Sequence, residues 1–175
     1  MTLQETNKAL NKFAKYVIQQ ARTKLTKSKK NVSNDLYDSL DSEIKVSKNS
    51  FSMDMLMDKY GMFQDRGVKG TESGKSLSNY SYKQSSNLKG FEAATGTFAK
   101  WAKFRRMQPR DKKGRFGSYK TMGFILANSI KKKGIKPSLF FTKPFEKAFK
   151  NLPKDIVKAY ALDVEQLMKN TINNK

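Results

Sequence analysis

"TNKALNKFAKYVIQQARTKL", residues 6–25, carries the clearest structural pattern in the chain. Its apolar residues recur at intervals of three and four positions, which places them on one face of an α-helix. Thr2 followed by Glu5 fits a capping box at the start of this helix, and the polar residues 26–35 form a linker after it. We therefore expect an amphipathic N-terminal helix whose buried face contains Leu10, Phe13, Ala14, Val17, Ile18, Ala21 and Leu25.

Beyond the linker, the apolar period changes from that of a helix to that of a strand. Apolar and polar residues alternate over two short runs that are separated by "KNS". This period of two is typical of strands with one buried face. The sequence predicts a β-hairpin with a tight turn at Lys48–Ser50 and with Ile44, Val46, Phe51, Met53, Met55 and Met57 as its alternating apolar positions.

The second half of the chain carries further helical patterns. "FAKWAKFRRM", residues 98–107, predicts a short basic helix, and a second face is predicted at Met122, Ile125, Leu126 and Ile130. Pro144 and Pro153 each suit the first turn of a helix. A long C-terminal helix is predicted from the stripe Ile156, Val157, Tyr160, Ala161, Val164, Leu167 and Met168.

These elements predict an α+β fold. A small antiparallel, hairpin-based sheet is packed by the N-terminal helix, a central basic helix and the long C-terminal helix. The chain of 175 residues has the length of a single domain, which we place over residues 1–175. Residues 70–97 are rich in Ser, Gly, Asn and Thr without a regular period, and we expect a long polar arm there that becomes ordered against a partner.

Composition narrows the classes of function. The formal net charge is +21, so the surface attracts polyanions. Cysteine and histidine are both absent, which removes thiol nucleophiles, imidazole bases and the usual zinc ligands. Asp35, Asp38 and Asp41 recur every three residues, but such carboxylates more often cap a short helix than hold a metal. We expect no enzyme activity, no cofactor and no metal.

Neither a membrane span nor a secretory signal is visible in the sequence. No run approaches the roughly 18 apolar residues that cross a bilayer. The start, "MTLQETNKAL", lacks the apolar core of a signal peptide. We therefore expect a soluble, unprocessed protein with no membrane partner.

The strongest charge lies in the middle of the chain. Residues 91–136 contain 13 Lys and Arg residues against Glu92 and Asp111 alone. A surface that serves only solubility mixes both signs, so this excess predicts a counter-charge from outside the chain. In the basic helix-turn region, residues 100–118, we expect Trp101 and Phe104 to pack in the core. The cations predicted to face DNA or a protein partner are Lys100, Lys103, Arg105, Arg106, Arg110, Lys112, Lys113, Arg115, Lys131, Lys132 and Lys133.

The order of these parts resembles the small neck or tail-completion (head-tail joining) proteins of tailed bacteriophages. The resemblance covers most of the chain and is carried by "YGMFQDRG", residues 60–67, and by the run from "KKKGIKPSLFF" into "KPFEKAF", residues 131–149. It implies a structural virion protein that assembles in the bacterial host cytoplasm as a homo-oligomeric ring. That ring would join the capsid portal or connector to the tail around the DNA channel. Its partners would be other portal, connector and tail proteins, with non-specific contact to double-stranded DNA.

Two rival interpretations remain at the level of sequence. A free, sequence-independent nucleic-acid-binding protein would also use cations interleaved with rings. A small nuclease would need a carboxylate cluster and a metal. For the ring, the sequence leaves open whether the basic segment faces DNA or protein.

Overall fold

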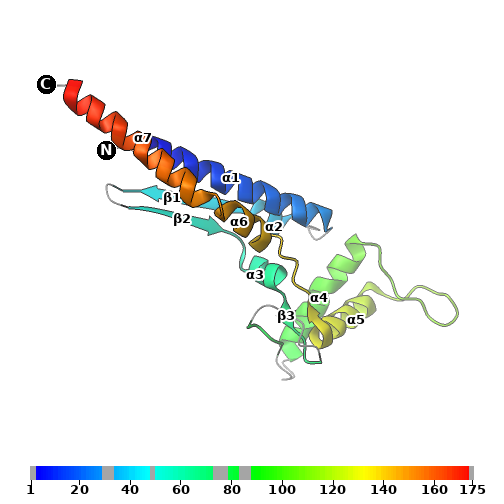
Figure 1. The fold of residues 1–175 in the computed structure, drawn as a ribbon. Helices are drawn as coiled ribbons and strands as arrows, with labels where there is room; N and C mark the ends of the chain where they lie inside the picture. The colour runs from blue at the N-terminus through cyan, green and yellow to red at the C-terminus, as the bar shows by residue number, and fades with distance from the viewer. Residues whose placement is uncertain (1–2, 29–33, 48–49, 73–78, 83–87, 174–175) are drawn as a thin grey trace. The chain divides into compact units, whose positions relative to one another are not determined.

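The structure is a computed structural model that describes residues 3–28, 34–47, 50–72, 79–82 and 88–173 (Figure 1). The α+β class is confirmed, since helices dominate and two short antiparallel strand pairs accompany them. The chain divides into two compact units, whereas the sequence predicted a single domain over residues 1–175. Unit 1 contains residues 1–59 and 139–175, and unit 2 contains residues 60–138. Because unit 1 is discontinuous in the chain, local patterning could not reveal this division.

Unit 1 is built around the long helix α1 (Gln4–Lys27). This helix packs against α7 (Leu152–Asn173), against α6 (Thr142–Phe149) and against strand β1 (Asp41–Val46). Figure 1 shows α1 and α7 side by side. The predicted apolar face of α1 is confirmed, with only Ile18 less than fully buried among its members. The buried members are Leu10, Phe13, Ala14, Val17, Ala21 and Leu25.

The predicted hairpin is confirmed as a strand pair that begins slightly earlier than expected, but Phe51, one of its predicted apolar positions, is 41% exposed. Strand β1 pairs in antiparallel register with β2 (Phe51–Leu56), and Ile44 lies opposite Met53. Ile44, Met53 and Met55 pack on the cluster formed by Leu10, Phe13, Val17 and Leu152. Residues 48–49 of the predicted turn lie outside the described residues. A four-residue helix, α2 (Asp35–Asp38), precedes the hairpin and buries Leu36.

The start of α1 is capped from the other end of the chain. Leu3 occupies the N-cap position without a side-chain hydrogen bond, and Thr2, the predicted cap, lies outside the described residues. Instead, Asp163 of α7 accepts hydrogen bonds from the backbone N–H groups of Glu5 and Thr6, both at 2.9 Å. The Thr6 hydroxyl donates a third at 2.8 Å. A carboxylate at a helix N-terminus satisfies N–H groups that have no partner within the helix.

The apolar stripe predicted for the C-terminal helix, α7, is only partly buried. Both prolines lie in first helical turns, as predicted, because α6 begins at Thr142 and α7 at Leu152. Over residues 152–169 of α7, Leu152, Ala159 and Asp163 are buried, and Ile156, Val164 and Leu167 are half-buried. Val157 and Met168, by contrast, are 68% and 63% exposed. The predicted helix is confirmed, but part of its stripe is exposed because α7 carries apolar residues on two faces, and the face that packs on α1 includes a buried carboxylate.

Helix α3 (Lys59–Arg66) belongs to unit 2 from Tyr60 onward, and it is followed by a short strand pair, β3 (Val68–Lys69) with β4 (Gly134–Ile135). Gly67 joins α3 to β3 with a φ of 78°, a conformation that side chains other than glycine rarely adopt. A Cβ atom at Gly67 would also lie 2.3 Å from the carbonyl oxygen of Ile135. This glycine therefore allows the strand pair to close directly behind α3.

Two helices of unit 2, α4 (Leu88–Phe104) and α5 (Tyr119–Lys133), pack on each other. Small residues make their contact: Ala102, Gly123 and Ala127 are buried, and a Cβ at Gly123 would lie 2.4 Å from the carbonyl oxygen of Thr95. The predicted apolar face of α5 is wrong in part, because Ile125 is exposed and the buried residues are Gly123 and Ala127. The central basic helix thus packs on α5, and the hairpin of unit 1 packs on α1.

The predicted polar arm at residues 70–97 is wrong at its C-terminal end. Residues 88–97 are helical and belong to α4. Their glycines and threonines have low helix propensity, which hid the helix in the sequence. Residues 73–78 and 83–87 of the arm lie outside the described residues. Between these two gaps, the Lys69 N–H donates to the Tyr80 carbonyl, and the Tyr82 N–H donates to the Lys69 carbonyl. The Tyr80 ring contacts the Phe63 ring edge-on, with 4.9 Å between the ring centres.

Candidate nucleic-acid interface

A narrow turn connects α4 to α5, and we call its residues, Met107–Gly117, the tongue. Figure 1 shows this connection running out from the ends of the two helices. Its two arms meet at an antiparallel bridge between Arg110 and Phe116. The Gly117 N–H donates to the Pro109 carbonyl at 2.8 Å, and the turn closes at Gly114, whose φ is 81°. The tongue is therefore an ordered, hairpin-like projection.

Asp111 organises the tip of the tongue. Its Oδ1 accepts from the backbone N–H groups of Lys113 and Arg115, at 2.9 and 2.8 Å. Its Oδ2 accepts from Nε of Arg115 at 2.9 Å. The backbone and side-chain hydrogen bonds of Arg115 hold the pKa of Asp111 below its ordinary value. The carboxylate of the tip is thus committed to the fold of the tongue.

The predicted cations of the tongue are brought together and are exposed. Arg110, Lys112, Lys113 and Arg115 all lie in the tongue as exposed residues. The Arg110 guanidinium lies 4.5 Å from the centre of the Phe116 ring. Because Asp111 offsets one of the four charges, the tongue has a net positive charge, and its counter-charge must come from dissolved anions or from a partner.

The cations at the end of α4 are less uniform than predicted. Lys100, Lys103 and Arg106 are exposed, and Arg106 has a φ of 54° where the helix ends. Arg105 is half-buried, with its guanidinium 5.6 Å from the centre of the Trp101 ring. The structure thus gives Arg105 a packing role beside Trp101. This differs from the partner-facing position that the sequence predicted.

Lys131, Lys132 and Lys133 lie at the far end of α5, about 20 Å along the helix from the tongue at 1.5 Å per residue. Lys132 forms an ion pair with Glu72 at 2.9 Å, and the Lys131 and Lys132 carbonyls accept from the backbone N–H groups of Thr71 and Glu72. These lysines belong to the end of a helix whose dipole they oppose. The structure does not bring them together with the tongue, and Glu72 was missed because it falls in the predicted arm.

Two aromatic rings beside these cations were also misjudged or missed. Phe104, predicted to pack in the core, is 67% exposed, and Trp101, predicted to pack there as well, is only half-buried. Phe116 is 64% exposed at the base of the tongue. Helical spacing placed Phe104 on the side of Trp101, but the helix ends at Phe104 and leaves nothing to cover the ring. Exposed rings next to arginines form a surface that can stack on bases as well as meet phosphates.

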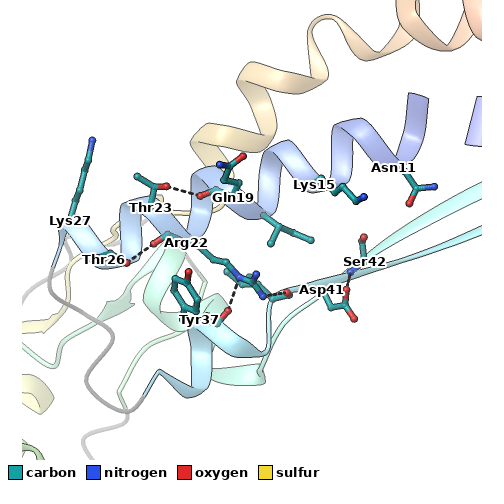
Figure 2. Close-up of a pocket in the computed structure, with 12 residues that line it drawn as sticks. Asn11, Lys15, Gln19, Arg22, Thr23, Thr26, Lys27, Tyr37, Asp41 and Ser42 are labelled. Atoms are coloured by element: carbon teal, nitrogen blue, oxygen red, sulfur yellow. Dashed lines mark hydrogen bonds between the residues drawn. The ribbon is translucent and has the colours of Figure 1, made fainter. Parts of the chain in front are cut away.

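A separate hollow in unit 1 lies between α1 and the start of β1 (Figure 2). Arg22 dominates it: Nε donates to the Tyr37 carbonyl and a terminal nitrogen donates to the Leu40 carbonyl, both at 3.1 Å. The same guanidinium lies 5.0 Å from the centre of the Tyr37 ring. Arg22 thus ties α1 to the segment that enters the hairpin, and we assign it a structural role.

Other kinds of site are not supported in the described part of the chain. No group of three or more carboxylates is gathered there that could hold a metal ion, and Asp35 and Asp38 lie exposed on α2. No helix among the described residues combines the length and apolarity needed to cross a bilayer. Comparison of the chain with protein-family models, with curated proteins and with solved structures gave no match.

Proposed function

We propose that this chain is a structural virion protein of a tailed bacteriophage, a ring-forming neck or tail-completion component that joins the capsid portal or connector to the tail around the DNA channel. In this proposal the chain acts without catalysis, cofactor or metal. The observation that carries its contact with DNA is the tongue: exposed cations on an ordered projection whose carboxylate is already engaged.

The geometry of the tongue suits loose contact with phosphates. Its cations project from a turn held by main-chain hydrogen bonds, so binding orders little further backbone. Lysine and arginine contacts to phosphate carry no sequence information. A lumen through which a genome passes needs contacts of this kind, because base-specific contacts would hold the DNA in one register.

The assembly part of the proposal rests on the resemblance in sequence. The segments that carry it are well-defined structural units: "YGMFQDRG" forms α3 and the turn at Gly67, and "KPFEKAF" forms α6. Along α6 and its N-cap residue Phe141, the rings of Phe141, Phe145 and Phe149 stack in succession, with distances of 5.8 and 5.6 Å between neighbouring ring centres. Phe145 also meets Phe13 of α1 edge-on.

Adding the purified chain to isolated portal–connector complexes, followed by electron microscopy, tests the assembly. We expect a new ring of density on the axis of the complex. A chain that stays monomeric and leaves the complexes unchanged would contradict the proposal.

Charge reversal tests the role of the tongue. The triple variant Lys112→Glu, Lys113→Glu and Arg115→Glu should weaken binding to duplex DNA and lower the slope of log affinity against log salt by about 2–3, since each phosphate contact contributes about 0.9. The matched control reverses Lys143, Lys150 and Lys154, three exposed lysines of unit 1. Equal losses in both variants would show that net charge alone matters.

A second candidate function, a free sequence-independent nucleic-acid-binding protein, is favoured by the exposed rings of Phe104 and Phe116. Stacking on unpaired bases contributes about 1–3 kcal/mol per base. If this candidate function is correct, the chain should bind single-stranded nucleic acid tightly, and Phe116→Ala should weaken that binding several-fold. The neck proposal expects weak binding to duplex DNA and little effect of that substitution.

A further inference from the structure

A groove between α1 and the α6–α7 segment is not used by anything described so far. It has a volume of about 540 Å³ and lies wholly within unit 1. Its apolar lining comes from both sides: Ala9, Phe13 and Tyr16 on α1, and Ala148, Leu152, Ala159 and Leu162 on α6 and α7. Tyr16 and Leu162 are 40% and 50% exposed, so the groove leaves apolar surface in contact with water.

Lysines surround this apolar lining. Lys12 of α1 and Lys158 of α7 contribute from the two long helices, and Lys8 and Lys147 complete the set. Glu5 and Asp155 are the acids in the lining, and Glu5 is already paired with Lys8 at 2.6 Å. Within the described residues, no ion pair is formed by Lys12, Lys147 or Lys158, which leaves an excess of positive charge around the groove.

We propose that this groove is a docking site for an amphipathic helix of a partner protein, one that carries an apolar stripe flanked by acidic residues. A groove between two helices accepts an apolar stripe of the period i, i+4, i+7, because such a stripe fills a concave floor. Acidic flanks complement the surrounding lysines and disfavour basic partners. The inference goes beyond contact with DNA and does not depend on it.

A second copy of the chain fits the groove less well than an acidic partner. The apolar face of α7 that remains exposed, with Val157 and Met168, is flanked by Lys154 and Lys158, whereas Lys169 is paired with Glu165 at 2.7 Å. Those lysines would meet the lysines around the groove. A lipid surface also fits less well, because amphipathic helices that lie on membranes present a convex apolar face rather than a groove.

The test uses the full chain and a labelled 14-residue designed peptide with leucines at i, i+4, i+7 and i+11 and with glutamates beside them. Fluorescence anisotropy should show saturable binding. Two control peptides separate the causes: one has lysines in place of the glutamates, and one is a scramble of identical composition without the stripe. Both should bind at least about tenfold more weakly, because the first loses charge complementarity and the second loses the apolar match.

Variants of the groove complete the test. Lys12→Glu together with Lys158→Glu should weaken binding of the acidic peptide about tenfold or more, whereas Lys154→Glu, outside the groove, should leave it unchanged. Ala9→Trp, which fills the groove, should also abolish binding, with circular dichroism confirming that the helices persist. The charge reversal of the tongue should not alter peptide binding, which keeps this result distinct from the test of DNA contact.

Three results would overturn the inference. The first is equal binding of the acidic peptide and its scramble, which would indicate general attraction to a chain of net charge +21. The second is unchanged affinity in the Lys12→Glu, Lys158→Glu variant. The third is that the chain does not bind the peptide but binds vesicles of anionic phosphatidylserine, and that Lys12→Glu together with Lys158→Glu abolishes this vesicle binding. That result would make the groove a membrane contact.

Discussion

Unit 1 and unit 2 differ in where they place their large apolar side chains. Unit 1 buries leucines, valine and phenylalanines in two clusters around α1, including Leu10, Val17 and Phe140. In unit 2, the apolar residues that are buried in the described part are Val68, Ala102 and Ala127. Its phenylalanines at 104, 116 and 124 are exposed.

This difference shows how the two units divide the buried apolar surface among their described residues. Burial of large apolar side chains is the main source of folding stability, at about 25 cal/mol per Å². Among the described residues, unit 1 therefore has more of this source of stability than unit 2. Unit 2 keeps its α4–α5 contact close by using small residues and leaves rings and cations outside, which is the arrangement expected of a surface that is covered in an assembly.

The largest loss of stability should follow from removing the carboxylate of Asp163, which caps the start of α1. Asp163→Ala removes a buried carboxylate and leaves the N–H groups of Glu5 and Thr6 and the Thr6 hydroxyl without their acceptor. We expect a loss of about 3 kcal/mol in the free energy of unfolding, from the lost cap and the unsatisfied donors together. Chemical denaturation measures it, with Asp155→Ala, an exposed acid on the same helix, as the control. Equal stability of the two variants would mean that α1 and α7 are joined by apolar contact alone.

The second largest loss of stability should come from widening the close contact between α4 and α5 at Gly123. Gly123→Ala places a Cβ 2.4 Å from the Thr95 carbonyl oxygen and 2.8 Å from the Ala99 nitrogen, so α4 and α5 must separate. We expect a loss of about 2 kcal/mol, typical of overpacking. The same change at Gly96, where a Cβ meets nothing within 4 Å, should stabilise the helix by about 0.5–1 kcal/mol. Amide exchange rates in α4 and α5 measure the change in stability for each variant. If Gly123→Ala and Gly96→Ala changed stability in the same direction, the close packing at Gly123 would be refuted.

Much of unit 1 could be predicted from the sequence, because its apolar periodicities are local and strong. The face of α1 and the hairpin around Met53 were predicted correctly. The cap by Asp163 was not, since a bond between residues more than 150 positions apart leaves no pattern in the chain. The position of Phe104 was also unpredictable, because its spacing is that of a core residue and only the end of the helix exposes it.

Acid should weaken unit 1 through Asp163. Burial alone raises the pKa of this carboxyl, but hydrogen bonds from Glu5, Thr6 and Gln4 outweigh it, and the pKa in the folded chain lies below its ordinary value. Its contribution to stability is therefore complete above the ordinary aspartate pKa of about 3.9 and is lost as the pH falls through the lowered folded value. The stability difference between the native chain and Asp163→Asn should shrink over that range. A difference that stays constant with pH would show that the charge of Asp163 does not contribute.

The smallest effect on stability should come from the tongue, and it sharpens the contrast with Asp163. Asp111→Asn weakens the bonds to Lys113, Arg115 and the Arg115 side chain, yet all of these groups are exposed and stay solvated. The unfolding midpoint should not change, whereas amide exchange at Lys113 and Arg115 should accelerate. Both aspartates accept backbone N–H bonds, but Asp163 is 3% exposed whereas Asp111 is exposed, so the expected difference in outcome follows mainly from burial. If Asp111→Asn unfolded unit 2, the tongue would be part of the core of that unit, and its cations would be less available to DNA than we propose.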